Sequence, residues 1–478
     1  MLFPTFEFFY FFTLVLILNW FFKRWPVVWR LFLLFSSYYF YSVWDNNFLL
    51  ILVAISVFNF FSALLIDKTI LGLRKFLLFI AVFVNLLALG FFKYYDFFRV
   101  STELLLRKFG FLVTLPLLEI ILPVGLSFYI IRAISYNIDI YRRKIVATFS
   151  LLDFLIYISF FPQILSGPVM RAGDFLLQLK DGGAKKIENF YHHLTLIFLG
   201  LFKKLVISSY LVLSITDDVF AVPENHSQLV LLLAVFAYSI VIYFDFSGYS
   251  DMAIGFAGLL GFKTPINFDT PYLSSNIKDF WRRWHITISD WMRDYVYIPL
   301  GGNRKGLARK YFNLMAVMIL VGLWHGTNHF IVWGAVNGLA LIIFNVYQDI
   351  KNRSFKIDIE PVEKWREDIS KFFGGSVTFI FVSFSWIFFR SESTENAIKF
   401  LKSLFDFSKN SEPLKIHILV LLFIGFLVFL FEKQIIKSLT KIQQRLSVPL
   451  LILFSVLVMI LILKLGPDII PPFIYFNF

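Results

Sequence analysis

Residues 314–347 read LMAVMILVGLWHGTNHFIVWGAVNGLALIIFNVY, two strongly apolar runs joined by the polar string GLWHGTNH. One uninterrupted helix over residues 312–347 would be about 54 Å long at 1.5 Å per residue, nearly twice the roughly 30 Å of hydrocarbon in a bilayer. Gly322 and Gly326 lie on either side of Trp324 and His325 and favour a break at this string. The stretch therefore predicts two membrane helices that meet at a break containing His325.

The rest of the chain has the same apolar character. Of its 478 residues, 58% are hydrophobic, 20% are aromatic and only 16% are charged, which is more apolar surface than a soluble fold can hide. The apolar runs cover residues 6–22, 31–43, 48–65, 76–92, 118–134, 151–165, 194–213, 229–244, 252–262, 314–324, 330–347, 377–389, 416–431 and 449–465. Several runs are too short to cross a bilayer alone, so we predict an all-α polytopic membrane protein with about 10–13 transmembrane helices. Re-entrant and interfacial amphipathic helices are expected to surround a central polar tunnel.

The polar stretches between these runs are too short for a separate soluble domain. We predict one membrane-embedded domain over residues 1–478, with a core at 115–345, N-terminal spans at 1–114 and C-terminal spans at 370–478. The first run opens with Glu7 rather than with basic residues, so it is expected to be a retained span. No internal repeat is evident, which disfavours a transporter built from inverted repeats.

The formal net charge of +13 arises from Lys and Arg residues, many of them in short loops between apolar runs. This pattern follows the positive-inside rule and suits contact with anionic headgroups, so membrane lipids are expected partners and nucleic acid is not. The chain contains no cysteine, which excludes disulfides, cysteine metal ligands and an acyl-thioester on the protein itself.

A second informative segment, residues 277–295, combines tryptophan, arginine and histidine. At 100° per residue, a helix places Trp281 and Trp284 on an apolar arc and the charged side chains opposite. His285 lies at the border of the two arcs. The segment is predicted to be an amphipathic helix at the membrane interface. Its histidine and the pair Arg282 and Arg283 are then either interfacial groups that extend toward water or the mouth of a polar cavity.

His325 is the strongest candidate for chemistry. The neighbouring glycines let a ligand approach its imidazole closely, and a desolvated neutral imidazole can take a hydroxyl proton as a general base. The residues alone leave a structural role open, in which His325 satisfies backbone carbonyl groups at the break. No metal site is predicted, because the Gly-Thr-Asn between His325 and His329 disfavours helix and no third ligand is evident.

Upstream, Arg132 and Asp139 lie beside a Pro-Gly break in LPVGLSFYIIRAISYNIDIYRRK. Charged residues next to apolar runs are usually paired, so these two are expected to form a structural clamp. No nucleotide-binding P-loop, dinucleotide fingerprint or Ser-His-Asp order is present, and ATPase and soluble hydrolase chemistry therefore have no support.

Four segments together resemble one known family. DFWRRWHITISDWMRDYVYIPLGGNRKG, GLWHGTNHFIVWG, YFDFSGYSDMAIGFAGLLGF and FFPQILSGPVMRAGDF are similar to the membrane-bound O-acyltransferase (MBOAT) proteins of bacteria, in particular the membrane subunit of alginate O-acetylation. The resemblance extends over about residues 123–338. A departure is Arg132, where the alginate-type proteins usually carry Gln. The segment IPLGGNR is typical of the alginate type rather than of the sibling group that transfers D-alanine.

The resemblance implies transfer of an acyl group, usually acetyl, from a cytoplasmic acetyl-CoA or other acyl-CoA to an extracytoplasmic polysaccharide or cell-wall polymer. It implies no bound cofactor, a periplasmic acetyl-carrier or acetyltransferase partner, and a place in the bacterial cytoplasmic (inner) membrane. The family's two histidines correspond to His325 and His285, the expected catalytic residues. The expected substrate-binding residues are Trp324, Trp281, Trp284, Asn328, Arg282, Arg283, Arg304 and Lys305, the four cations being suited to the phosphates of CoA.

Two alternatives stay open at this point. One is D-alanine transfer to a cell-envelope polymer, and the other is a polysaccharide or small-molecule transporter without acyl-transfer chemistry. A catalytically silent scaffold for a partner protein is a third function that the residues allow.

Overall fold

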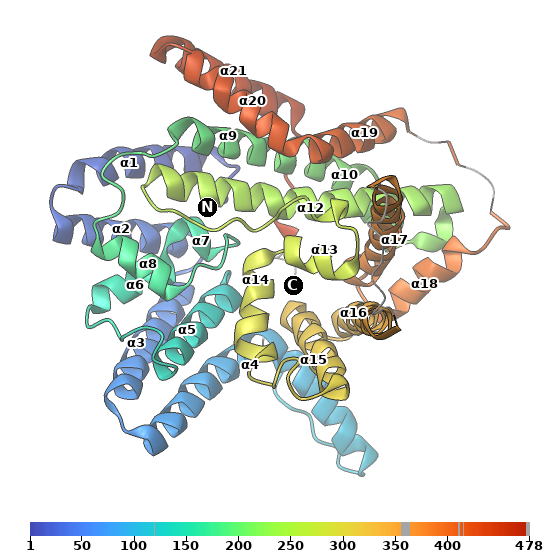
Figure 1. The fold of residues 1–478 in the computed structure, drawn as a ribbon, viewed down its shortest axis with the longest axis horizontal. Helices are drawn as coiled ribbons and strands as arrows, with labels where there is room; N and C mark the ends of the chain where they lie inside the picture. The colour runs from blue at the N-terminus through green and yellow to red at the C-terminus, as the bar shows by residue number, and fades with distance from the viewer. Residues whose placement is uncertain (119, 355–363, 410–411, 414, 475–478) are drawn as a thin grey trace. The chain divides into compact units, whose positions relative to one another are not determined.

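The computed structural model describes residues 1–478 except 119, 355–363, 410–411, 414 and 475–478. Within the described residues, every regular element is a helix (Figure 1). This confirms the predicted all-α class.

Eight helical stretches in the described part are long and apolar enough to cross a membrane. They are α3 (Asn46–Lys68), α4 (Leu71–Lys108), the continuous stretch Phe190–Ala221, α12 (Gln228–Leu259), α15 (Leu307–His325), α16 (His329–Ser354), α17 (Lys364–Arg390) and α21 (Val448–Leu465). A ninth results if α19 (Ile416–Leu430) and α20 (Glu432–Arg445), bent by 76°, count as one span. The protein is a multi-pass membrane protein, and its described residues contain eight or nine candidate spans by length and composition, against the predicted 10–13.

The lower count has a physical origin in how the apolar runs fold. The runs at 229–244 and 252–262 merge into the single 32-residue helix α12. The run at 151–165 divides into two short helices, α6 (Leu151–Ser159) and α7 (Phe161–Ile164), neither of which is long enough to cross hydrocarbon.

The chain forms two compact units, of which the first comprises Met1–His193 and Ala253–Pro265. Besides α3, α4, α6 and α7 it contains α1 (Phe6–Phe22), α2 (Pro26–Ser42), α5 (Leu126–Tyr141) and α8 (Ala172–Lys180). Three buried amides join its helices: Asn59 and Asn85 exchange hydrogen bonds of 3.0 and 2.7 Å, and Asn137 donates to Asn59 at 2.7 Å. Such interhelical hydrogen bonds stabilise helix packing in lipid.

The predicted clamp between Arg132 and Asp139 is wrong. Arg132 donates to the carbonyl oxygen of Tyr157, and its guanidinium lies 4.5 Å from the centre of the Tyr157 ring. Asp139 forms an ion pair with Lys144 at 3.8 Å. A carbonyl and an aromatic ring therefore accommodate this buried cation where a carboxylate was expected.

The second unit comprises Leu194–Met252 and Ile266–Phe478. Its remaining elements are α9 (Phe190–Leu201, which begins in the first unit), η1 (Phe202–Ser208), α10 (Ser209–Leu211), η2 (Val212–Thr216), α11 (Asp217–Ala221), η3 (Pro223–Asn225), η4 (Pro271–Leu273), α13 (Ile277–Arg283), α14 (Ile286–Met292), η5 (Arg293–Tyr297) and α18 (Thr394–Leu404). The π-helices η1, η2 and η5 interrupt or end α-helices, a local form that is frequent at functional sites.

Two consecutive buried lysines in the π-helix η1 pair with different acids. Lys203 Nζ lies 2.5 Å from Asp251 and 2.6 Å from Glu432, while Lys204 Nζ lies 2.5 Å from Asp245. Charges in a membrane protein are tolerated when they are paired in this way. The two acids from α12 therefore tie that helix to the α9–α11 stretch within the second unit.

The helices α15 and α16 form a tightly packed hairpin and lie side by side (Figure 1). Gly322 and Gly334 permit the close approach: a Cβ on Gly322 would collide with the carbonyl of Phe330, and one on Gly334 with the carbonyl of Met318. Small residues at such crossings are the usual means of bringing membrane helices together. This packing holds the break between the two helices in place.

We predict opposite effects for two glycine substitutions. Gly334→Ala introduces a methyl group against a backbone carbonyl and should lower the free energy of unfolding by about 1–3 kcal/mol. Gly90→Ala, in α4, points into open space and gains helix propensity, so it should leave stability unchanged or raise it. Thermal unfolding in detergent measures both, and equal Tm values for the two variants would contradict the packing described.

Candidate active site at two helix breaks

The first break separates α13 from α14 at Trp284 and His285. His285 adopts a left-handed backbone conformation, with φ 42° and ψ 54°, directly before α14. The prediction of one continuous amphipathic helix over 277–295 is therefore wrong. The freed backbone groups pair with a neighbouring loop: Ile286 N–H donates to Asn267 O at 2.9 Å, and Asp269 N–H to Arg283 O at 3.0 Å. The break turns the imidazole inward rather than along an interface.

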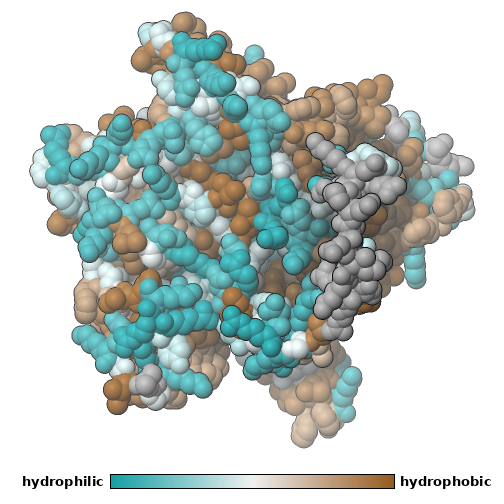
Figure 2. Space-filling view, in the orientation of Figure 1, coloured by the Kyte–Doolittle hydropathy of each residue, from teal (hydrophilic) through white to brown (hydrophobic). Residues whose placement is uncertain are grey.

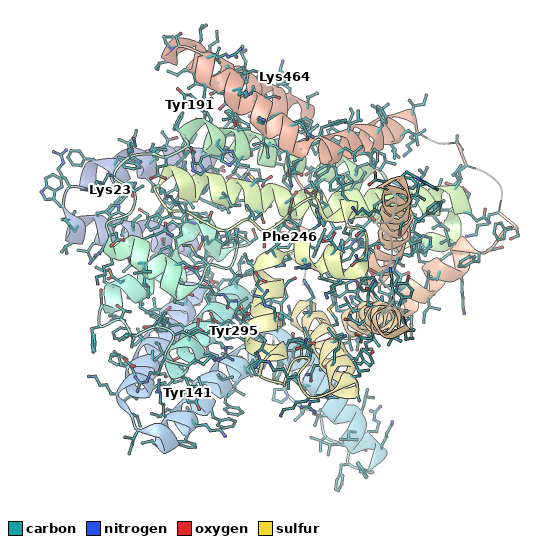
Figure 3. The ribbon with its side chains drawn as sticks, in the orientation of Figure 1. Lys23, Tyr141, Tyr191, Phe246, Tyr295 and Lys464 are labelled. Atoms are coloured by element: carbon teal, nitrogen blue, oxygen red, sulfur yellow. The ribbon has the colours of Figure 1, made fainter. Side chains whose placement is uncertain are left out.

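His285 is 3% exposed and is surrounded by rings. The Phe246 ring lies edge-on at 4.5 Å between centroids, and those of Trp324 and Phe268 lie at 6.2 and 6.4 Å. Figure 3 labels Phe246 beside α13 and α14. Burial lowers the pKa of His285 to about 3, because charging the ring would require desolvating an imidazolium. The side chain is therefore neutral at physiological pH.

The second break, at GLWHGTNH, is where it was predicted. α15 ends at His325 and α16 begins at His329, with Asn328 in a left-handed conformation between them. The imidazole of His325 is 5% exposed and contacts the rings of Trp324, Phe389 and Trp333 at 4.8, 4.9 and 5.5 Å between centroids. Gly326 leaves room for Phe330, whose ring a Cβ at that position would meet.

One cavity of about 600 Å³ in the second unit is lined by both histidines. Of the predicted substrate-binding residues, Trp281, Trp284 and Arg282 also line it. Figure 2 shows hydrophilic side chains gathered over α13 and α14 on the face in view, whereas hydrophobic side chains cover the region of α19. The cavity thus joins a polar surface to two buried, ring-enclosed imidazoles.

The other predicted substrate-binding residues lie outside this cavity wall, as far as the described residues define it. Trp324 packs behind it, with its ring 6.2 Å from His285 and 4.8 Å from His325. Asn328 belongs to the loop between α15 and α16. Arg283 turns to Asp279, at 3.0 Å, while Arg304 and Lys305 lie in the exposed turn before α15. Arg282 and Arg283 are thus adjacent in sequence but face different surroundings.

Several residues of the cavity wall were missed from the sequence. They are Lys278, Ile286, Ile288, Ser289, Asp290, Met292, Arg293, Tyr297, Asn303, Lys310, Leu314, Val317, Met318, Val321, Leu341 and Asn345. Arg293 pairs with Asp290 at 2.6 Å, and Lys310 with Asp349 at 2.7 Å. Among the described residues, Lys278 and Arg282 have no carboxylate partner within ion-pair distance. These two cations leave an excess of positive charge on the wall.

A second cavity of about 500 Å³, also within the second unit, has the start of α16 in its wall. Its wall includes His329 and Phe330 at the start of α16, the Lys204–Asp245 ion pair, and Arg390, which pairs with Asp217 at 2.5 Å. Phe330 also stacks on His325 at 6.3 Å between centroids. Phe330 therefore lines the second cavity and contacts the histidine that lines the first.

In the described part of the chain, no group of three His, Asp or Glu side chains lies close enough together to bind one metal ion. His325 and His329 belong to two different helices separated by the break.

Comparison with known proteins identifies the family. The sequence model described as MBOAT, membrane-bound O-acyltransferase family, matches residues 30–384. The chain belongs to this family. It is 38% identical over 388 residues to a probable alginate O-acetylase of Pseudomonas putida, covering 79% of this chain and 75% of that protein. The identity is 35% over 407 residues to the peptidoglycan O-acetyltransferase of Helicobacter pylori, covering 79% and 74%.

A more distant MBOAT relative is the teichoic acid D-alanyltransferase of Bacillus subtilis, 28% identical over 279 residues, covering 55% of this chain and 68% of that protein. The membership and the O-acetyltransferase relatives together make this protein an O-acyltransferase. The alginate-type resemblance noted in the motifs is confirmed over most of the chain.

Because the native chain has no cysteine, single cysteines can probe the charge of the first cavity. We predict that Ser289→Cys, on the cavity wall, reacts faster with an anionic than with a cationic methanethiosulfonate, relative to their rates with a free thiol. Added salt should reduce the difference. Ser239→Cys, fully buried in α12 away from the cavity wall, should react with neither reagent. Equal normalised rates at Ser289→Cys would contradict the positive wall.

Proposed function

We propose that this protein, in the bacterial inner membrane, transfers an acetyl group from cytoplasmic acetyl-CoA to an extracytoplasmic acceptor hydroxyl, for O-acetylation of a polysaccharide or cell-wall polymer by way of a periplasmic partner. The observation that carries the proposal is the cavity that joins His285 and His325 to a cationic, polar wall. The relatives named for O-acetylation of alginate and peptidoglycan support the acetyl group and the class of acceptor. A periplasmic partner protein carries the acetyl group onward.

The positive wall supports a phosphorylated donor. Lys278 and Arg282 lack a carboxylate partner among the described residues, and both line the cavity. A guanidinium and an ammonium so placed suit the phosphates of CoA, with the acyl-pantetheine arm extending toward the histidines. Clustering of Lys and Arg around α13 and the turn before α15 also supports a cytoplasmic opening under the positive-inside rule.

The second cavity suits entry of the acceptor. α15 has 19 residues and is therefore roughly 28 Å long, close to the thickness of the hydrocarbon. The first cavity borders it from Lys310 to His325, and the second cavity begins at His329 and Phe330. An acceptor hydroxyl that enters through the second cavity meets the acyl thioester at His325, without either substrate crossing the bilayer.

In this proposal His325 acts as a general base. Its imidazole takes the proton of the acceptor hydroxyl as that oxygen attacks the thioester carbonyl; the C–S bond then breaks, and the leaving sulfur takes up the proton as CoA thiol. The products are the O-acyl ester and CoA, so no oxidant or further reactant is needed. The rings of Trp324, Trp333 and Phe389 around His325 exclude water, which suppresses hydrolysis of the thioester.

The first experiment measures CoA release by the purified protein in nanodiscs with acetyl-CoA, an acceptor and the periplasmic partner. We expect His325→Ala to reduce release by about 10²–10⁴-fold, the range attributable to a positioned general base. Matched Tm values for variant and wild type separate catalysis from folding. Undiminished release in the folded variant would remove His325 from the mechanism, and release driven by a D-alanyl carrier instead would favour the teichoic-acid type of donor.

The two adjacent arginines provide a matched pair for donor binding. Arg282→Gln should raise the KM for acetyl-CoA about three- to tenfold, equivalent to roughly 1 kcal/mol for one partly exposed ionic contact. Arg283→Gln should leave that KM unchanged, because its side chain is engaged by Asp279 outside the cavity wall. Steady-state kinetics with varied acetyl-CoA measures both values, and equal KM values for the two variants would refute donor binding at Arg282.

A further inference from the structure

The buried amide of Asn267 holds one particular nitrogen of His285. Asn267 is 1% exposed, and its Oδ1 lies 3.0 Å from Nδ1 of His285. The same oxygen accepts from the hydroxyl of Thr287 at 2.9 Å and from the Thr287 backbone N–H at 3.4 Å. All of these groups belong to the second unit. Three groups thus converge on one amide oxygen.

The orientation of this amide follows from its neighbours. A backbone N–H can only donate, so the atom that faces Thr287 N–H must be the amide oxygen and not the NH₂ group. The Nδ2 of Asn267 then lies 3.2 Å from the hydroxyl of Ser250, which accepts its hydrogen bond. The backbone of Asn267 is also fixed, because its carbonyl accepts from Ile286 N–H at 2.9 Å.

We propose that Asn267 is a positioning residue that selects the tautomer of His285 with its proton on Nδ1. An amide oxygen accepts, so Nδ1 must donate, and in a neutral imidazole the lone pair then resides on Nε2. His285 lines the cavity, so this tautomer supplies a hydrogen-bond acceptor there for an O–H or N–H of a substrate. The opposite tautomer would supply a donor. The use of that acceptor in catalysis rests on the proposed acyl transfer, whereas the tautomer itself does not.

The surroundings of His285 determine how it titrates. Its ring neighbours Phe246, Phe268 and Trp324 carry no charge. The charged or titratable side chains that share its cavity are Lys278, Arg282, Asp290, Arg293, Tyr297, Lys310 and His325. Arg293 and Lys310 are paired with Asp290 and Asp349, and it is burial that favours the neutral imidazole.

The tautomer can be measured directly by ¹⁵N NMR of histidine-labelled protein in lipid. We expect the His285 signals of wild type, assigned by their loss in His285→Gln, to show a protonated Nδ1 and an unprotonated Nε2. Asn267→Ala should give a mixture of tautomers. Asn337→Ala, a matched removal of a buried amide whose hydrogen bond among the described residues goes to the Trp333 carbonyl of its own helix, should leave the His285 signals unchanged. A proton on Nε2 in wild type, or an unshifted spectrum in Asn267→Ala, would overturn the proposal.

Kinetics separates positioning from a merely structural role. Asn267→Ala should lower kcat by about ten- to hundredfold with little change in KM, as for other residues that orient a functional imidazole. Asn267→Asp keeps the acceptor but adds a negative charge that raises the pKa of His285. It should therefore recover activity at high pH and lose it as the pH falls, with an acidic limb at higher pH than that of wild type. Equal pH profiles for wild type and Asn267→Asp would overturn the proposal.

These two readouts distinguish failure of this inference from failure of the proposed function. A wild type without transferase activity, but with the expected NMR signals and their change in Asn267→Ala, supports the tautomer and removes the acyl transfer. If wild type is an active transferase but its His285 signals do not change in Asn267→Ala, the acyl transfer is supported and the tautomer inference is removed.

Discussion

Backbone groups freed by a helix break in a membrane protein must find partners within the protein, because lipid offers none. The site depends on this constraint. At the α13–α14 break the partners come from residues 267–269. The carbonyl of Asn267 accepts a hydrogen bond from Ile286 N–H, and the N–H of Asp269 donates one to the carbonyl of Arg283. The same short segment supplies the Asn267 side chain that contacts His285. One loop therefore stabilises the break and orients the imidazole that the break exposes to the cavity.

The α15–α16 break is maintained by packing rather than by a loop. Gly322 and Gly334 bring the two helices close enough that their backbones touch on either side of the turn. His325 is consequently held at the end of a rigid hairpin, with Trp333 and Phe389 against its ring. A site in which side chains are fixed by rigid elements loses little positional precision to thermal motion, which general-base chemistry requires.

The sequence predicted the fold class and the second break because both follow from length and composition. An apolar stretch too long for the bilayer, interrupted by Gly322 and Gly326, has few alternatives to a hairpin. The first break was missed because the 100° periodicity of residues 277–295 persists across it, and periodicity does not register a single left-handed residue such as His285. Arg282 and Arg283 are likewise indistinguishable by type. The packing of α13 determines which of them faces the cavity.

Most buried charges of the second unit are paired, as a membrane environment requires. The lysines of η1 are neutralised by Asp245, Asp251 and Glu432, so they contribute little net field despite their burial. Arg293 and Lys310, on the cavity wall, are paired as well. The surplus positive charge of the wall is thereby confined to Lys278, in the first turn of α13, and Arg282, in its last turn, where the helix C-terminus favours a cation. An anionic donor is thus attracted to the cavity wall at Lys278 and Arg282, while uncharged aromatic rings enclose His285 and His325.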